Sequence, residues 1–222
     1  MRRRQQVPLP PNITVNRLLQ TITALVVVAT GAPNGRAQPS TPSSAQAALD
    51  EAKQLDQEVV KLHEEGKDQD ALGLAERALA VRQNALGLQH PDVAASLDNL
   101  AALLSAQGAY VKAEPLAARA LAIQEKVLGP THPSVAISLS TLGGIYRSQG
   151  AYAKAERQFA RALKIRERAL GPTDPSVATS LSNLALLLED RGDYTQAERL
   201  LVRARDIAEK PLAQRTPRSP RS

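Results

Sequence analysis

The sequence contains no cysteine and few aromatic residues: one phenylalanine, four tyrosines and no tryptophan among 222 residues. Without cysteine the chain cannot form a disulfide or use a thiolate as a nucleophile or metal ligand, which argues against redox chemistry. Aromatic side chains are also the usual platform on which proteins stack the bases of single-stranded nucleic acid. The scarcity of aromatic residues therefore argues against that class of binding protein as well.

The net charge of +6, from 28 basic and 22 acidic residues, is concentrated at the two ends of the chain. Residues 1–37 hold five arginines and no acidic residue, and residues 211–222 hold three more arginines among prolines and serines. The body between them, residues 38–210, has 20 basic and 22 acidic residues, a net charge of −2. Because such a body offers no broad surface for neutralising phosphates, we predict no binding of nucleic acid, and we expect residues 211–222 to be a disordered basic tail.

Residues 1–37 have the three parts of a secretory signal peptide. Arg2, Arg3 and Arg4 give a positively charged start, residues 18–29 form a short apolar segment, and Ala37 is a small residue suited to cleavage. The apolar segment is shorter than the roughly 20 residues that span a bilayer. We predict cleavage after Ala37 and a secreted or bacterial periplasmic location. An uncleaved membrane anchor, or a start codon assigned upstream of the true one, is the alternative. Residues 38–48 are expected to be a flexible linker.

A pattern of 42 residues repeats along the rest of the chain. The pairs His90-Pro91, His132-Pro133 and Asp174-Pro175 recur at this interval, and residues 91–132 are identical to residues 133–174 at 23 of 42 positions. The same register extends in both directions. The sequence therefore predicts four repeats, at about 49–90, 91–132, 133–174 and 175–210.

Each repeat has the pattern of a helical hairpin, because its apolar residues recur three and four positions apart. Gly108 is expected to end the first helix of the second repeat, and Gly129, followed by a proline, the second helix. Pro133 suits the first turn of the next helix, and Asp174 is a good N-cap. A single hairpin cannot bury its apolar stripe, so the repeats must stack. The predicted fold is all-α, a right-handed α-solenoid of four helix-turn-helix repeats.

These repeats resemble the tetratricopeptide repeat, in which large, small and alanine positions alternate in a fixed order along a helical hairpin. The signature positions are occupied in the second repeat by Leu97, Leu100, Ala101, Leu104, Ala113, Ala117 and Ala120; in the third by Leu139, Leu142, Gly143, Tyr146, Ala155, Phe159 and Ala162; and in the fourth by Leu181, Leu184, Ala185, Leu188, Ala197, Leu201 and Ala204. The length of 42 residues and the stretch from Arg119 to Pro133 are similar to the kinesin light chain and nephrocystin-like subtype. The resemblance covers residues 49–210 and implies a non-enzymatic protein that binds proteins or peptides in a concave groove.

Two residues depart from the repeat pattern, one near each end of the array. Glu58 stands where the other repeats have Leu100, Leu142 and Leu184, and Arg205 stands where they have Leu79, Leu121 and Leu163. The ends of a solenoid need polar surfaces. We therefore predict that Glu58 and Arg205 face solvent as caps.

The sequence contains no catalytic constellation, so we predict that the protein is not an enzyme and uses no cofactor or metal. The three histidines have no partner cluster; His90 and His132 are expected in loop or capping roles, and His63 on a solvated helix face. A phosphate-binding glycine loop, a Gly-x-Ser-x-Gly elbow and a His-Glu-x-x-His motif are all absent from the sequence.

The resemblance places the peptide-binding groove on the first helices. Among the groove positions transferred from the family, eight residues are predicted to bind a peptide: Asp98, Asn99, Ser140, Thr141, Arg147, Ser182, Asn183 and Glu189. Asn99 and Asn183 are the strongest candidates, because an amide side chain both donates and accepts and can hold a peptide backbone. Arg147 could form a forked pair with a ligand carboxylate. The groove lacks the several basic residues of a carboxylate clamp.

The sequence favours an exported scaffold or adaptor that binds a protein or peptide of unknown identity. Two alternatives stay open: a structural module that self-associates into homo-oligomers, and an accessory or regulatory subunit of an enzyme or secretion system. A membrane would be a partner only if the N-terminal segment is an uncleaved anchor.

Overall fold

The computed structural model describes residues 44–209, which form eight helices and no strand. The first helices of the four repeats are α2 (Ser44–Glu64), α4 (Pro91–Ala106), α6 (Pro133–Ser148) and α8 (Pro175–Asp190). The second helices are α3 (Asp68–Leu86), α5 (Tyr110–Leu128), α7 (Tyr152–Leu170) and α9 (Tyr194–Glu209). Residues 1–43 and 210–222, which include the predicted signal peptide and basic tail, lie outside the described residues.

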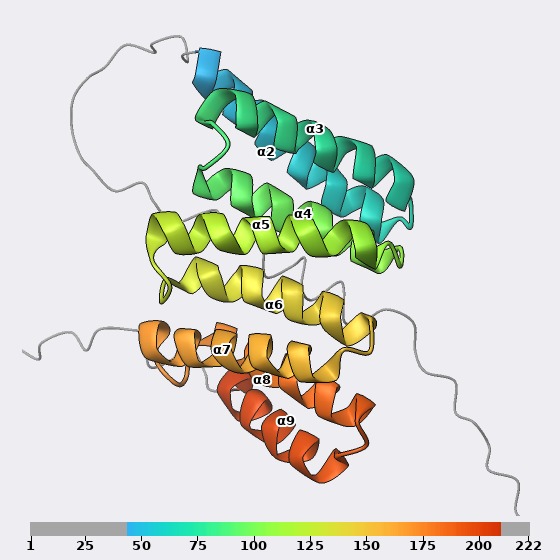
Figure 1. Ribbon diagram of the computed structural model, residues 1–222, viewed down its shortest axis with the longest axis vertical. Coiled ribbons are helices and arrows are strands. Elements are labelled where there is room, and N and C mark those ends of the chain that lie inside the picture. Colours follow the sequence, from blue (N-terminus) through green and yellow to red (C-terminus); the bar gives the residue numbers. More distant parts are fainter. Residues whose placement is uncertain (1–43, 210–222) are drawn as a thin grey trace, which may run out of the picture.

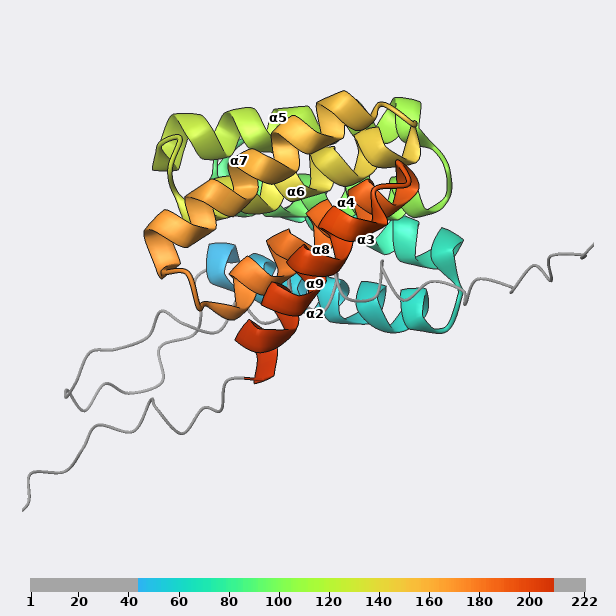
Figure 2. The ribbon, with the colours of Figure 1, turned by 90° about the horizontal axis from the view of Figure 1, so that it is seen from below.

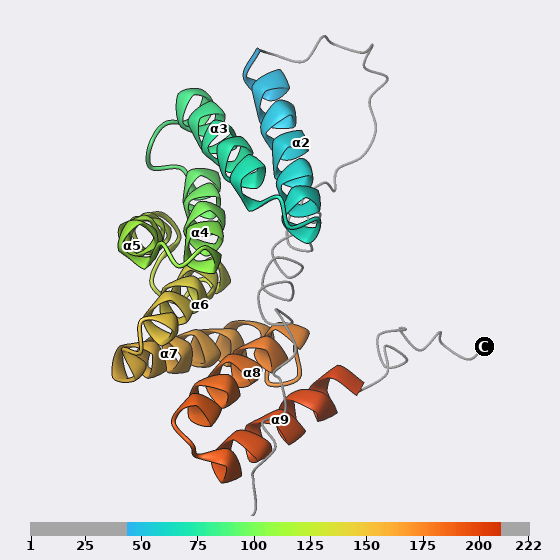
Figure 3. The same ribbon diagram turned by 90° about the vertical axis from the view of Figure 1, so that its right-hand side faces the viewer.

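The helices stack in chain order as antiparallel hairpins, with α2 and α3 at one end and α8 and α9 at the other (Figure 1). Figure 3 shows that the stack is curved: α2, α4, α6 and α8 line its inner side, and α3, α5 and α7 lie outside them. The predicted all-α solenoid is thus confirmed. Among the described residues, no helix is both long enough and apolar enough to cross a membrane.

The hairpin boundaries follow from glycine, proline and the N-caps. Gly108 has φ 76°, a left-handed conformation, and the N–H of the next residue, Ala109, donates to Leu104 O, five positions back, at 2.8 Å. Gly129 has φ 87° after α5. Pro133 occupies the first turn of α6, and the Asp174 carboxylate caps α8 by accepting from Ser176 N at 2.9 Å. The boundaries predicted at these residues are confirmed.

Helix α2 begins before the predicted start of the first repeat. Residues 44–48 were expected in a flexible linker, but they belong to α2. After Pro42 the sequence has no helix breaker until Gly66, and its alanines are strong helix formers, so the helix extends through them. The prediction of a linker over 44–48 is therefore wrong.

The core alternates leucine with alanine. Leu97, Leu139 and Leu181, one in each of three first helices, are fully buried, and burial of such a side chain contributes about 1.5 to 3 kcal/mol. Alanines at the signature positions are also buried and let the helix backbones approach closely; they include Ala101, Ala113, Ala120, Ala155, Ala162, Ala185 and Ala197. Buried residues of α2, α3, α4, α5 and α6 form one cluster, so the core continues from repeat to repeat.

Candidate functional site: the inner face of the solenoid

The inner face is the side of the curve lined by α2, α4, α6 and α8, and all eight residues predicted to bind a peptide lie on these first helices. They differ in exposure. Asp98, Ser140, Thr141 and Asn183 are each less than 9% exposed, whereas the other four are partly exposed: Asn99, Arg147, Ser182 and Glu189. The accessible part of the candidate site is therefore smaller than the sequence suggested.

The hydroxyls on the inner face bond to their own helices. Ser140 donates to Ala136 O at 2.7 Å, Thr141 to Ile137 O at 3.3 Å and Ser182 to Ala178 O at 3.0 Å. A serine or threonine that bonds to the carbonyl four residues earlier has used its donor. These three side chains can offer a ligand only their remaining acceptor capacity.

Arg147 is already paired within the chain. Its Nε donates to Asp190 Oδ2 at 2.5 Å and its Nη2 to Asp190 Oδ1 at 3.3 Å, a forked arrangement that joins α6 to the end of α8. A ligand carboxylate would have to compete with Asp190. This partner was not predicted from the sequence, although Asp190 follows Arg147 by 43 residues, one repeat plus one position, which was a usable signal.

The two asparagines retain unpaired amide atoms. Asn99 Oδ1 and Asn183 Nδ2 have no hydrogen-bond partner among the described residues, although each atom is shielded from solvent. Burying an amide group without a partner is unfavourable, so a ligand or a water that reached either atom would gain a hydrogen bond. Asn99 Oδ1 needs a donor and Asn183 Nδ2 an acceptor, the two groups that a peptide backbone supplies.

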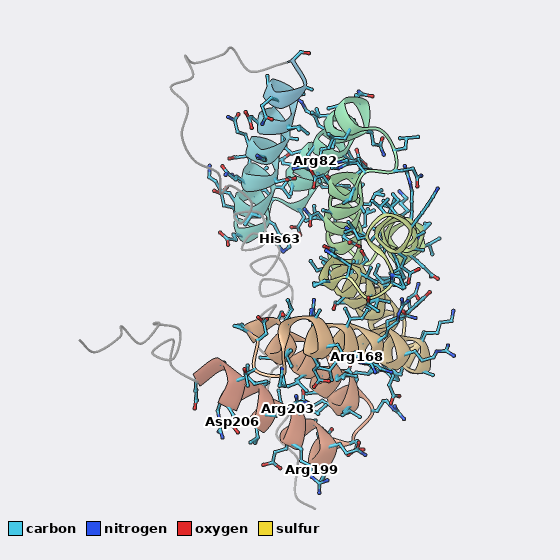
Figure 4. The ribbon with its side chains drawn as sticks, turned by 90° about the vertical axis from the view of Figure 1, so that its left-hand side faces the viewer. His63, Arg82, Arg168, Arg199, Arg203 and Asp206 are labelled. Carbon is cyan, nitrogen blue, oxygen red and sulfur yellow. The ribbon has the colours of Figure 1, made fainter. Side chains whose placement is uncertain are left out.

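A buried polar row runs through the stack behind the inner face, and its members repeat every 42 residues. Arg82 in the first repeat bonds to Asp56 of α2, with Nη1 to Oδ1 at 3.2 Å, and to Ser96 Oγ of α4 at 2.7 Å. Figure 4 shows Arg82 at this junction of helices. Gln124 and Arg166 occupy the same position in the second and third repeats.

The second repeat has the acid of this row without the base. Asp98, the counterpart of Asp56, is 2% exposed and accepts from Ser138 Oγ at 2.5 Å, but its Oδ1 has no partner among the described residues. Gln124 stands where an arginine would compensate its charge. Burial raises the pKa of the Asp98 carboxyl to about 8, and the Ser138 hydrogen bond opposes this only in part.

The third repeat has the base without the acid. Arg166 donates to Ser180 Oγ at 2.5 Å, but Ser140 replaces the aspartate seen at positions 56 and 98. Burial lowers the pKa of Arg166 to about 10. This row was not predicted from the sequence, although its polar residues recur at intervals of 42 and so carried a signal for it.

The family of the chain follows from a direct match. The tetratricopeptide repeat model matches three overlapping stretches, residues 59–126, 99–168 and 142–210, which together cover more than half of the sequence. The chain belongs to the tetratricopeptide repeat family. No curated protein matches it.

Solved structures with the same fold include kinesin light chain-like repeat proteins. The chain is similar to BtubC (BKLC) from P. vanneervenii, with a TM-score of 0.63 and 24% identity over 84% of this chain and 73% of that one. It is also similar to a Podosopora anserina protein with nearly identical kinesin light chain-type TPR-like repeats, with a TM-score of 0.55 and 26% identity over 91% and 88% of the two chains. RapI in its apo form has a TM-score of 0.56 and 18% identity over 74% and 44%.

These similarities confirm the kinesin light chain-like subtype expected from the 42-residue period. Tetratricopeptide repeats generally mediate binding between proteins and typically have no enzymatic activity, and no catalytic family is indicated by these matches. Within residues 44–209 there is no group of three or more histidine, cysteine or acidic side chains that could hold a metal ion.

The histidines of these tetratricopeptide repeats have structural partners. His90 Nδ1 accepts from Asp92 N and His132 Nδ1 from Ser134 N, both at 3.1 Å, so the predicted capping role is confirmed. His63 was expected on a solvated face, which is wrong: its side chain is only 13% exposed, and Nδ1 lies 2.7 Å from Asp68 Oδ1. The turn between α2 and α3 brings Asp68 back onto the end of α2, where it covers His63.

Proposed function

We propose that this protein is an exported, non-enzymatic adaptor that holds a segment of a partner protein on the inner face of its tetratricopeptide repeats. The observation that carries the proposal is the pair Asn99 and Asn183. They lie at the same position of the second and fourth repeats, on helices that line the inside of the curve, and each keeps an amide atom without a partner among the described residues. Partly exposed side chains of both charges, Arg147 and Glu189, lie on the same face.

Asparagine pairs of this kind favour a ligand held by its backbone. An amide recognises the peptide groups of a bound segment, whereas specificity for side chains comes from the neighbouring charges. Because Arg147 is already bound to Asp190, we expect the backbone contacts to contribute more to affinity than a contact to a ligand carboxylate.

A pull-down with the full chain as bait tests the inner face. Recovery of partner proteins from the native host should fall at least severalfold for the double variant Asn99→Ala/Asn183→Ala, because both backbone contacts are lost. Asn84→Ala is the matched control, since Asn84 is an exposed asparagine on the second helix α3. Thermal unfolding of each variant checks that the bait is folded. If the double variant and the control recover equal amounts of partner protein, the partner does not bind through Asn99 and Asn183, and the proposed role of the inner face is wrong.

Export is tested separately with residues 1–37 fused to an alkaline phosphatase that is active only outside the cytoplasm. We expect activity from the intact segment and none after Val27→Arg, which places a charge within the apolar segment. N-terminal sequencing of the exported chain should begin at Gln38. An active fusion that keeps residues 1–37 would instead support the uncleaved anchor.

A further inference from the structure

The outer side of α9 forms an apolar surface at the end of the stack. Figure 2, which looks at the stack from this end, shows α9 as the nearest helix with no described element in front of it. Tyr194 is 70% exposed, Leu201 38% and Val202 41%. Together with charged neighbours these residues line a cleft, which we call the end face: Glu189, Tyr194, Glu198, Leu201, Val202 and Arg205.

The third repeat shows what covers the same surface inside the stack. Leu201 corresponds to Phe159 of α7, one repeat earlier. Phe159 is only 3% exposed and lies in a cluster with Leu187 and Leu184 of α8 and Tyr146 of α6. The two leucines lie three residues apart on one helix face. By the symmetry of the repeats, the end face is shaped for a helix with apolar residues at this spacing.

Charges at the end face specify one end of that helix. In the third repeat, Glu156 of α7 pairs with Arg191, just after α8, at 2.6 Å. Its counterpart on α9, Glu198, has no ion pair among the described residues. Glu189 likewise occupies the position of Arg147, which pairs with Asp190 of the next first helix, but here the sign is reversed. Both glutamates would therefore form favourable ion pairs with basic residues at the carboxyl end of a covering helix.

A second copy of this chain does not meet these requirements. In the register of the repeats, its α2 would bring Glu58 and Lys61 where α8 has Leu184 and Leu187. It would also bring Glu64 and Glu65 where α8 has Asp190 and Arg191, opposite Glu189 and Glu198. Like charges facing each other across an interface are unfavourable. The chain beyond α9, residues 210–222, has a single leucine and three prolines and cannot supply the apolar pair.

We propose that the end face binds an amphipathic helix of another protein, with apolar residues three and four apart and basic residues at its carboxyl end. This site is separate from the inner face, because it lies on the outer side of α9, and only Glu189 belongs to both. The protein would then hold two partner segments at once and bring them together.

The probe is a fluorescein-labelled peptide of residues 175–191 carrying Asp190→Arg. A hydrocarbon staple that replaces Ser182 and Leu186, on the helix face opposite Leu184 and Leu187, holds it helical. Its control is the same peptide with Asp190→Glu and Arg191→Glu, which has the acidic end of α2. Fluorescence anisotropy with the full chain should show saturable binding of the basic-ended peptide and at least tenfold weaker binding of the control. Glu198→Lys should reverse this preference.

Two variants locate the binding. Leu201→Glu should abolish it, while Val111→Ser, at an 87% exposed residue of α5, should leave it unchanged. Tyr194→Ser gives a second end-face variant in case Leu201→Glu fails to fold. The proposal is overturned if the two peptides bind equally, or if Leu201→Glu and Tyr194→Ser have no effect. If the peptide binds only after residues 210–222 are removed, the end face is the binding site of the chain's own tail. If sedimentation shows a dimer that Leu201→Glu dissociates, the end face binds a second copy of the chain.

Discussion

At the scale of single residues, the N-caps of the first helices show how one position of the repeat accepts different chemistry. His90 and His132 accept the capping hydrogen bond through Nδ1, and Asp174 does so through a carboxylate oxygen. A histidine caps only while Nδ1 carries no proton, whereas a carboxylate also places a negative charge at the positive end of the helix dipole. The aspartate is thus the stronger cap at neutral pH.

His132→Asp should stabilise the protein. We expect the free energy of unfolding at pH 7 to rise by about 0.5 to 1 kcal/mol, because the new carboxylate caps α6 and interacts with its dipole. Urea unfolding followed by circular dichroism measures the change. The reciprocal variant, Asp174→His, should lose a similar amount. Equal stability of all three proteins would show that the side-chain cap contributes little in this fold.

At the scale of helices, the two helices of the third repeat fit by matching a small residue on one with a large residue on the other. Gly143 of α6 faces Phe159 of α7, and a Cβ added at Gly143 would lie 2.7 Å from Phe159 Cε1. The equivalent pairs are Ala101 with Ala117, and Ala185 with Leu201. The only phenylalanine of the chain thus lies opposite the only glycine at this position of the described repeats.

Gly143→Ala and Gly144→Ala form a matched pair for testing this fit. Alanine favours helix over glycine by about 1 kcal/mol at either position. At Gly144 a Cβ meets nothing within 4 Å, so that variant should gain about 0.5 to 1 kcal/mol in the free energy of unfolding. At Gly143 overpacking of about 1 to 3 kcal/mol outweighs the gain, so the variant should be destabilised.

Phe159→Leu should then rescue Gly143→Ala, because it recreates the alanine and leucine pair of the fourth repeat. Chemical denaturation of the two single variants and the double variant gives their interaction energy. Additive effects in this cycle would mean that Gly143 and Phe159 do not constrain each other.

At the scale of the whole molecule, the buried polar row makes stability depend on pH. The pKa of Asp98 is raised from 3.8 to about 8 in the folded protein, so between these values the folded state binds more protons than the unfolded state. Stability contributed by the neutral carboxyl is therefore present at low pH and is lost as pH rises toward 8. Asp98→Asn removes this titration.

We expect the free energy of unfolding of the wild type to fall, relative to that of Asp98→Asn, between pH 5 and pH 8. Urea titrations of both proteins at the two pH values measure the difference, and the other titrating groups cancel in the comparison. Parallel pH profiles for the two proteins would contradict a neutral buried Asp98.

Gln124→Arg should stabilise the protein at pH 8 by about 1 to 3 kcal/mol, because it supplies Asp98 with the base that Arg82 gives Asp56 in the first repeat. Equilibrium unfolding measures the gain, and the control is the same substitution in the Asp98→Asn background, where it should vanish. If Gln124→Arg still raises the free energy of unfolding in the Asp98→Asn background, the increase comes from packing and not from the charge of Asp98.

The fold was predictable because every level of the sequence agrees: the period, the caps and the apolar spacing all indicate stacked hairpins. The candidate site was predictable only by position. Sequence spacing placed Asp98 and Thr141 on the inner side, but the next first helix covers part of that side, as the contact of Ser138 with Asp98 shows. Solvent exposure at Glu58 and Arg205 was correctly predicted, since the side chains are 47% and 61% exposed. The exposed apolar surface of α9 was not predicted, because Tyr194 is identical to the partly buried Tyr152, and Leu201 is apolar like the buried Phe159.

The difference between the two ends gives the solenoid a direction of growth. A hairpin added by duplication after Glu209 would bury Leu201, as its counterpart Phe159 is buried, and would partly cover Tyr194, as its counterpart Tyr152 is partly covered. A hairpin added before Ser44 would meet Glu58 and Lys61, and several substitutions would be needed before it packed. Lengthening of such an array, by evolution or by protein engineering, is therefore easier at its carboxyl end.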